Sequence, residues 1–252
     1  MPSERDTSGS GSVVTHVALF PTELMSIRPR VGRAAGILLQ RAGMKVTLMD
    51  TPAQCGWMAF TLGDARRARQ EAEAWLDAVV TFPAIVVPSP AAVQYIRYYM
   101  PLLFNGDARR MADIDAVGAR TWELFTFLSA HSTSTLSPVL PGRGLLIPPC
   151  PSPTFPHLRE ELQALIAPQD DTPLDVIPIP HCCSWGGSFH LDMPELSAAM
   201  MDTLVETAEL FKPDYLAVLD IGCQILLEEA LDRRGWSLPV YHLAQVLTGD
   251  VP

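Results

Sequence analysis

The sequence predicts an α/β protein made of two similar halves, each with parallel strands connected by helices. Short β-branched runs alternate with longer segments of helical periodicity, which is typical of parallel sheets with right-handed crossovers. The same order of strands and helices occurs twice, and the residues that follow corresponding strands match. We expect a flexible N-terminus over residues 1–12, a first half over 13–140 and a second half over 141–252.

In the first half, three strands are expected, of which the first is buried, and a helix follows each of them. Apolar residues recur at intervals of three and four in the helical segments. Gly43 is placed to end the first helix, and Asp64 to cap the second. The expected strands are Val13–Phe20, Lys45–Met49 and Ala84–Val87, and the expected helices span 31–42, Asp64–Thr81 and 93–99.

The second half repeats this order. Asp192 followed by Glu195 is typical of the start of a capped helix. The expected strands are Gly144–Ile147, Leu174–Ile179 and Tyr215–Leu219, and the expected helices span Pro156–Ala167, Asp192–Phe211 and a segment that begins at Gly222.

Four of the five cysteines follow predicted strands of the second half: Cys150, Cys182, Cys183 and Cys223. The carboxyl ends of parallel strands meet at one edge of a sheet, where ligands bind. A single buried cysteine is usually part of the core, but four at corresponding strand ends favour a shared metal site. Thiolates suit an iron–sulfur cluster or zinc. A disulfide between the adjacent pair would strain the backbone.

The residues around the cysteine pair are candidates for the surroundings of this site. Gly186 and Gly187 would let backbone N–H groups approach the sulfur atoms, and Trp185 would pack over the loop. His181 and His190 are candidates for a further ligand or for hydrogen-bond donors to sulfur, or are simply polar loop residues.

The equivalent positions of the first half have lost most of these ligands. They read Glu23, Gln54, Cys55 and Ala92, so that one thiol remains of four. Ala92 cannot ligate a metal, and we expect Cys55 to be a buried thiol without chemistry. The first half is therefore interpreted as a scaffold for the second.

Charge and hydropathy exclude several classes of protein. With 28 acidic and 18 basic side chains the formal net charge is −10, which argues against nucleic-acid binding. No apolar run approaches the roughly 18–20 residues of a membrane span, and the polar N-terminus lacks the apolar core of a secretion signal. We expect a cytoplasmic protein. Nucleotide-binding and serine-hydrolase motifs are absent.

The pattern of Cys150, Cys182–Cys183 with Trp185–Phe189, and Asp220–Cys223 resembles the cysteine-rich CCG domain. This domain occurs twice in heterodisulfide reductase B, in the iron–sulfur subunit of glycolate oxidase and in lactate-utilisation protein A. Segments such as Pro29–Ala34 and Thr121–Leu124 look like those of the last. The resemblance extends from about Val13 to Gly249.

The resemblance implies a subunit for electron transfer in a cytoplasmic complex that oxidises a 2-hydroxy acid such as L-lactate or glycolate. Its cofactor would be an iron–sulfur cluster of the [4Fe-4S] type, and its partners would be other subunits, with a homo-oligomer as a further option. The fifth cysteine of the family is Leu226 here, and Ser184 replaces a glycine. The alternatives are a zinc-binding structural or assembly subunit without redox role and a thiol or heterodisulfide reductase subunit. The sequence identifies no catalytic residue.

Overall fold

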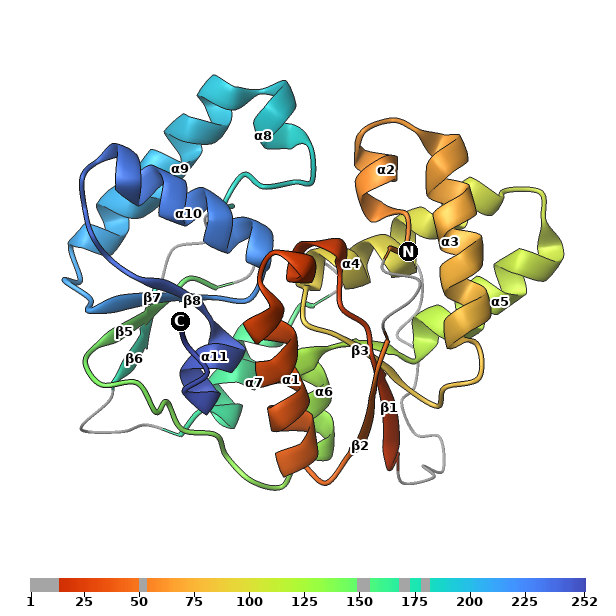
Figure 1. Ribbon diagram of the computed structural model, residues 1–252, viewed down its shortest axis with the longest axis horizontal. Helices are drawn as coiled ribbons and strands as arrows, with labels where there is room; N and C mark the ends of the chain where they lie inside the picture. The colour runs from red at the N-terminus through yellow and green to blue at the C-terminus, as the bar shows by residue number, and fades with distance from the viewer. Residues whose placement is uncertain (1–13, 50–53, 149–154, 168–172, 178–181) are drawn as a thin grey trace.

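The protein contains two four-stranded, all-parallel sheets, each flanked by helices (Figure 1). The computed structural model describes residues 14–49, 54–148, 155–167, 173–177 and 182–252, and the expected N-terminal segment 1–12 lies outside them. The strand order is β2-β1-β3-β4 in one sheet and β6-β5-β7-β8 in the other, so the two sheets have the same topology. The predicted α/β class with two similar parallel halves is confirmed.

The first sheet contains β1 (His16–Leu19), β2 (Lys45–Leu48), β3 (Ile85–Val87) and β4 (Thr121–Glu123), and the second contains β5 (Gly144–Leu146), β6 (Leu174–Val176), β7 (Tyr215–Val218) and β8 (Val240–His242). The helices around the first sheet are η1 (Glu23–Ser26), α1 (Pro29–Arg41), α2 (Trp57–Thr61), α3 (Ala65–Val79), α4 (Pro90–Gln94), η2 (Tyr95–Tyr99), η3 (Met100–Phe104), α5 (Ala108–Ala119) and α6 (Leu124–His131). Those around the second are α7 (Leu158–Leu165), α8 (Phe189–Asp192), α9 (Pro194–Glu209), α10 (Ile221–Arg233) and α11 (Leu243–Thr248).

The sequence analysis missed the fourth strand of each sheet and the helix that follows it. Strands β4 (Thr121–Glu123) and β8 (Val240–His242) each end in a polar residue, Glu123 or His242, which interrupts the apolar run by which the other strands were predicted. One expected cap is wrong. The helix expected from Asp192 is interrupted at Met193, because the residue before a proline is disfavoured in helical conformation. Asp192 instead accepts a hydrogen bond from Ser188 Oγ at 2.9 Å.

The inner strands of each sheet, β1 and β3 in the first and β5 and β7 in the second, are buried on both faces, as is typical of parallel sheets, whereas the edge strands β2 and β6 are partly exposed. In β1, Val17 and Leu19 face a core shared with α1, α6, α7 and α11, whereas Ala18 and Phe20 face the opposite layer. Helices α1 and α6 of the first half pack against α11 and α7 of the second. The two halves thus bury a common core, and residues of one half can reach the sheet edge of the other.

Candidate functional site

Three of the four predicted ligands line one cavity at the carboxyl edge of the second sheet. Cys182, Cys183 and Cys223 surround a space of about 170 Å³ beyond the ends of β5 and β7. Cys183 and Cys223 are joined as a disulfide, with their Cα atoms 5.5 Å apart, while the Cys182 side chain is exposed. Cys150 lies outside the described residues. The fold therefore brings together thiols that are far apart in sequence.

Both halves contribute to the walls of this cavity. Ile147, Phe155 and Val218 provide apolar surface from the second half. Helix α4 of the first half, which lies at the junction between the halves in Figure 1, adds the side chains of Pro90 and Gln94. This contribution was not predicted, because no sequence pattern connects α4 with the cysteine loops.

A buried carboxyl group connects α4 with the helix that carries Cys223. Asp220 caps α10 by accepting from the Gly222 N–H at 2.9 Å. It also accepts a hydrogen bond of 2.5 Å from Ser89 Oγ, and Ser89 itself caps α4. Burial raises the pKa of the Asp220 carboxyl. Ser89 and Asp220 thus hold the first turns of two equivalent helices together beside the cysteines.

The backbone of the cysteine loop is unusual at Ser184. Ser184 has a φ of 59°, which costs a non-glycine residue about 1–2 kcal/mol. Its buried hydroxyl lies 2.8 Å from Ser197 Oγ, so the side chain anchors the loop to α9. The Ser184 N–H also donates to Cys182 Sγ at 3.3 Å. Hydrogen bonds of the Ser184 side chain therefore offset the cost of its positive φ.

The glycine pair and Trp185 are confined by neighbouring residues. A side chain at Gly187 would meet Thr61 at the end of α2, so that glycine is required where the two halves touch. Trp185 lies against the Cα of Gly222 on one side. It stacks on His190, with ring centroids 4.5 Å apart. His181 lies outside the described residues.

The equivalent region of the first half is a buried acidic cluster. Cys55 is fully buried, and burial together with the nearby Glu23 raises the pKa of its thiol. Burial also raises the pKa of the Glu23 carboxyl, whose oxygen atoms have no hydrogen-bond partner among the described residues. Ala92, the counterpart of Cys223, is fully buried. The burial of Cys55 agrees with the expectation from the sequence.

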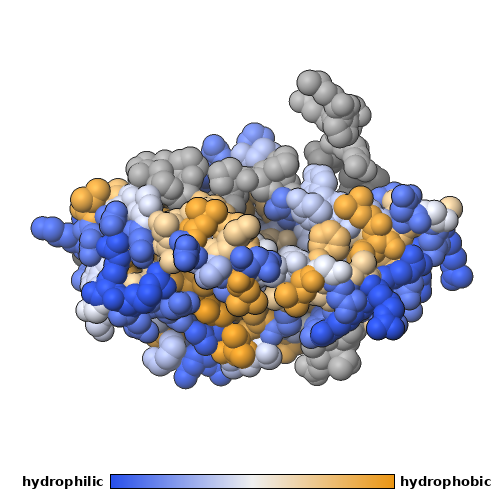
Figure 2. Space-filling model, turned by 90° about the horizontal axis from the view of Figure 1, so that it is seen from above, coloured by the Kyte–Doolittle hydropathy of each residue, from blue (hydrophilic) through white to orange (hydrophobic). Residues whose placement is uncertain are grey.

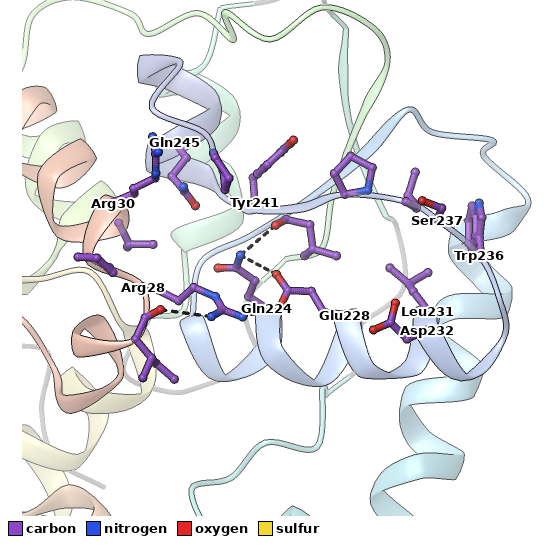
Figure 3. Close-up of a pocket in the computed structure, with 17 residues that line it drawn as sticks. Arg28, Arg30, Gln224, Glu228, Leu231, Asp232, Trp236, Ser237, Tyr241 and Gln245 are labelled. Carbon is purple, nitrogen blue, oxygen red and sulfur yellow. Dashed lines mark hydrogen bonds and ion pairs between the residues drawn. The ribbon is translucent and has the colours of Figure 1, made fainter.

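The largest cavity described lies elsewhere, with a volume of about 630 Å³ between the start of α1 and the outer side of α10. Figure 3 shows Gln224 and Glu228 on α10 beside Arg28, whereas Arg30 lies near Gln245. Both arginines are in ion pairs, Arg28 with Glu228 at 2.7 Å and Arg30 with Asp250 at 3.2 Å. Because their charge is compensated, this cavity has less potential for binding an anion than its arginines suggest.

Exposed apolar side chains occur close to the cysteine loop. Ser188, at the end of this loop, donates through Oγ to the Thr61 carbonyl oxygen at 2.8 Å and so joins α8 to α2. Viewed from above, the surface combines apolar patches with charged residues (Figure 2). The exposed apolar residues of these two segments and of the start of α9 are Leu62, Leu191, Met193 and Leu196.

Two absences concern the described part of the chain. In the ranges given above, no three His, Cys, Asp or Glu side chains are arranged as a set of metal ligands. The predicted ligand Cys150 is not among these residues, so the four-cysteine site stays a prediction. No helix within the described residues has the length and apolar character needed to cross a bilayer.

These features define an α/β protein with two parallel sheets and a cysteine-lined cavity at the edge of the second. No protein-family model matches the chain. It is 29% identical over 236 residues to lactate utilization protein A of Geobacillus thermodenitrificans, covering 92% of this chain and 98% of that protein. It is also 29% identical to the protein of the same name from Geobacillus kaustophilus and 27% identical to that from Macrococcus caseolyticus, again over 92–93% of this chain and 97–98% of each relative.

The fold is shared with a solved structure of more distant sequence. A hypothetical protein from Helicobacter pylori superposes with a TM-score of 0.58 at 12% identity. The alignment covers 94% of this chain and 49% of that one, so the chain spans about half the length of the structure it matches.

Proposed function

We propose that the protein is an iron–sulfur electron-transfer subunit of a complex that oxidises a 2-hydroxy acid, of the lactate or glycolate type. The observation that carries this proposal is the convergence of Cys182, Cys183 and Cys223 on one cavity. The names of the relatives support lactate utilisation as the process.

The residues of the cavity fit a thiolate-bound cluster in their chemistry. Sulfur donors are what such clusters require, and the apolar wall of Ile147, Phe155 and Val218 gives the low dielectric that tunes them. Cys150 would be the fourth ligand. Cysteine ligates a metal as its thiolate, so the disulfide between Cys183 and Cys223 has to be reduced before these two residues can bind one.

A bound cluster would supply reversible one-electron transfer. The chain itself would supply the ligands and hold them in position. Asp220, which accepts from Ser89 of the first half, fixes the first turn of α10, on which Cys223 lies. The stacked Trp185 closes one side of the cavity against water. Since the first half retains one thiol of four, we propose a single centre rather than a two-centre relay.

Partner subunits are part of the proposal, because an electron carrier needs a donor and an acceptor. The exposed residues Leu62, Leu191, Met193 and Leu196 lie on segments joined to the cysteine loop by the bond between Ser188 and Thr61. Exposed apolar side chains next to a redox centre are suited to contact another subunit.

A second candidate is a thiol or heterodisulfide reductase subunit. The disulfide between Cys183 and Cys223 favours it, because Cys182 lies in the same cavity and on the exposed side. A thiolate can attack a neighbouring disulfide and exchange with it. Such a protein would need no metal, which separates it from the first proposal.

Metal and sulfide analysis of protein purified under reducing, oxygen-free conditions tests these proposals. About four irons per chain with matching acid-labile sulfide and a broad absorption near roughly 400 nm are expected for the cluster. A colourless protein with about one zinc would indicate the structural alternative. Protein that stays metal-free after reconstitution contradicts both the cluster and the zinc site. Thiol–disulfide exchange is then the function that remains.

The two half-sites provide a matched pair of variants. Cys183→Ser is expected to remove most of the metal, because it deletes a sulfur of the cavity. Cys55→Ser should leave the metal content unchanged, since Cys55 is buried in the first half. Equal loss of metal in both variants would contradict a single site.

A further inference from the structure

An aromatic pair connects the wall of the cysteine cavity with the protein surface. Trp185 is buried and lines the cavity together with Cys183 and Cys223. Its ring packs against the Cα of Gly222, the residue that precedes Cys223 in the chain. The same ring stacks on that of His190, with centroids 4.5 Å apart and planes inclined by 16°. The two rings therefore form a continuous column of packed atoms that starts at the cavity wall.

This column ends at α8, on the outside of the molecule. His190 belongs to α8 and is partly exposed. Leu191 and Met193, which come after it in the chain, are 63% and 55% exposed. Figure 1 shows α8 beyond the end of α9 and away from the strands of the second sheet. A protein that contacts α8 would therefore reach the aromatic pair without entering the cavity.

The first half keeps the tryptophan but not its aromatic neighbour. Trp57 is the counterpart of Trp185 and is likewise buried. The residue that stands as far after Trp57 as His190 stands after Trp185 is Leu62, which has an aliphatic side chain. A buried tryptophan alone is thus enough to pack this loop in the half that has lost its thiols. The second ring occurs in the half that retains the cysteines, and loop packing leaves it unexplained.

We propose that Trp185 and His190 form the path by which an electron passes between the cysteine centre and a partner subunit bound at α8. An electron tunnels more readily through covalent bonds and closely packed atoms than across water, and stacked π-systems couple more strongly than aliphatic side chains. One electron leaves the donor and arrives at the acceptor, and neither ring changes its oxidation state. The inference rests on the function proposed above, which supplies the one-electron centre and its partners.

A measurement on metal-free protein tests the coupling between Trp185 and the sulfur atoms. While the disulfide between Cys183 and Cys223 is intact, an excited indole close to it transfers one electron to it and loses its fluorescence. The indole becomes a radical cation and the disulfide a radical anion. Reduction of the disulfide by a phosphine at slightly acidic pH removes this acceptor, so the tryptophan fluorescence of the wild type should rise. The rise should be lost in Trp185→Phe and kept in Trp57→Phe, the matched control. An equal rise in both variants overturns the inference.

The second ring is tested on iron-loaded protein with an electron donor of known position. A ruthenium tris-bipyridyl photosensitiser is attached to the thiol introduced by Leu191→Cys, and flash excitation gives the rate at which its electron reaches the centre. His190→Leu removes the ring and should slow this transfer several-fold. His190→Phe keeps a ring and should retain the wild-type rate. With the photosensitiser at Leu210→Cys, at the other end of α9, the rate should not depend on the side chain at position 190.

Iron content and midpoint potential of the same samples separate this inference from the proposed function. Both should equal the wild-type values in His190→Leu, so that a slower transfer reflects the path and not the driving force. Equal transfer rates in His190→Leu and His190→Phe, with iron retained, overturn the inference and leave the cluster standing. A wild type that binds no iron contradicts the proposed function and overturns the inference with it.

Discussion

Gly222 in the first turn of α10 is a position where one methyl group should disturb the whole cysteine cavity. A Cβ added there would lie 2.5 Å from Cδ1 of Trp185, whereas ordinary contacts begin at 3.4 Å. The indole would have to move by about 1 Å to restore ordinary contact with the added methyl group. Its stacking on the ring of His190 opposes such a movement. Overpacking of this kind costs about 1–3 kcal/mol. Against this, replacing glycine with alanine in a helix gains up to about 1 kcal/mol.

Gly36→Ala is the matched control, because Gly36 also lies in a helix and its added Cβ would be 3.7 Å from Leu19, an ordinary contact. Urea denaturation followed by circular dichroism gives the free energy of unfolding of both variants. We expect Gly222→Ala to be less stable than Gly36→Ala by about 1–3 kcal/mol, which is the cost of the clash. In a Trp185→Leu background the further change Gly222→Ala should cost much less than in the wild type, because the clashing ring is gone. Equal stability of the two alanine variants would refute the reasoning.

Three further predictions concern buried polar groups. Ser89→Ala should destabilise the protein by about 1–3 kcal/mol in urea denaturation, because it removes the side-chain donor to the buried carboxyl of Asp220. Burial raises the pKa of the Glu123 carboxyl to about 8, so the folded state binds this proton more tightly than the unfolded state does. The stability of the wild type relative to Glu123→Gln should therefore be greatest below about pH 4.5 and fall as the pH rises to about 8. The slope should be at most about 1.4 kcal/mol per pH unit. Ser184→Ala should destabilise the protein by about 1–3 kcal/mol, because the strained φ remains and Ser197 loses its hydrogen-bond partner. Ser184→Gly should cost less stability in the same assay, because glycine relieves the strain.

The controls for these predictions are drawn from the same chain. Ser237→Ala removes a hydroxyl from an exposed loop and should leave the stability unchanged within about 0.5 kcal/mol. A loss in Ser89→Ala no larger than that would show that the bond to Asp220 contributes little. A stability difference between wild type and Glu123→Gln that is constant from pH 5 to pH 8 would contradict the raised pKa. A Ser184→Gly variant less stable than Ser184→Ala would mean that the φ of 59° is not strained.

Local patterns in the sequence were sufficient for much of the fold. Six of the eight strands coincide with segments rich in β-branched and aliphatic residues, which strands favour. The cap at Asp64 was predicted and is present, since a capping side chain acts within its own helical turn. Strands β4 and β8 were missed because Glu123 and His242 interrupt the apolar run that marks the other strands.

The sequence by itself determined the repeated α/β order, the gathering of cysteines after strands of the second half and the loss of their counterparts in the first. Each of these depends on residue type and position along one strand or loop, and the carboxyl ends of parallel strands share one edge. Only the tertiary structure decided that Ser89 donates to Asp220, that Gly222 lies under Trp185 and that Gln94 lines the cysteine cavity. These contacts join residues far apart in the chain, and they depend on how two sheets and the helices between them pack, for which no local periodicity exists.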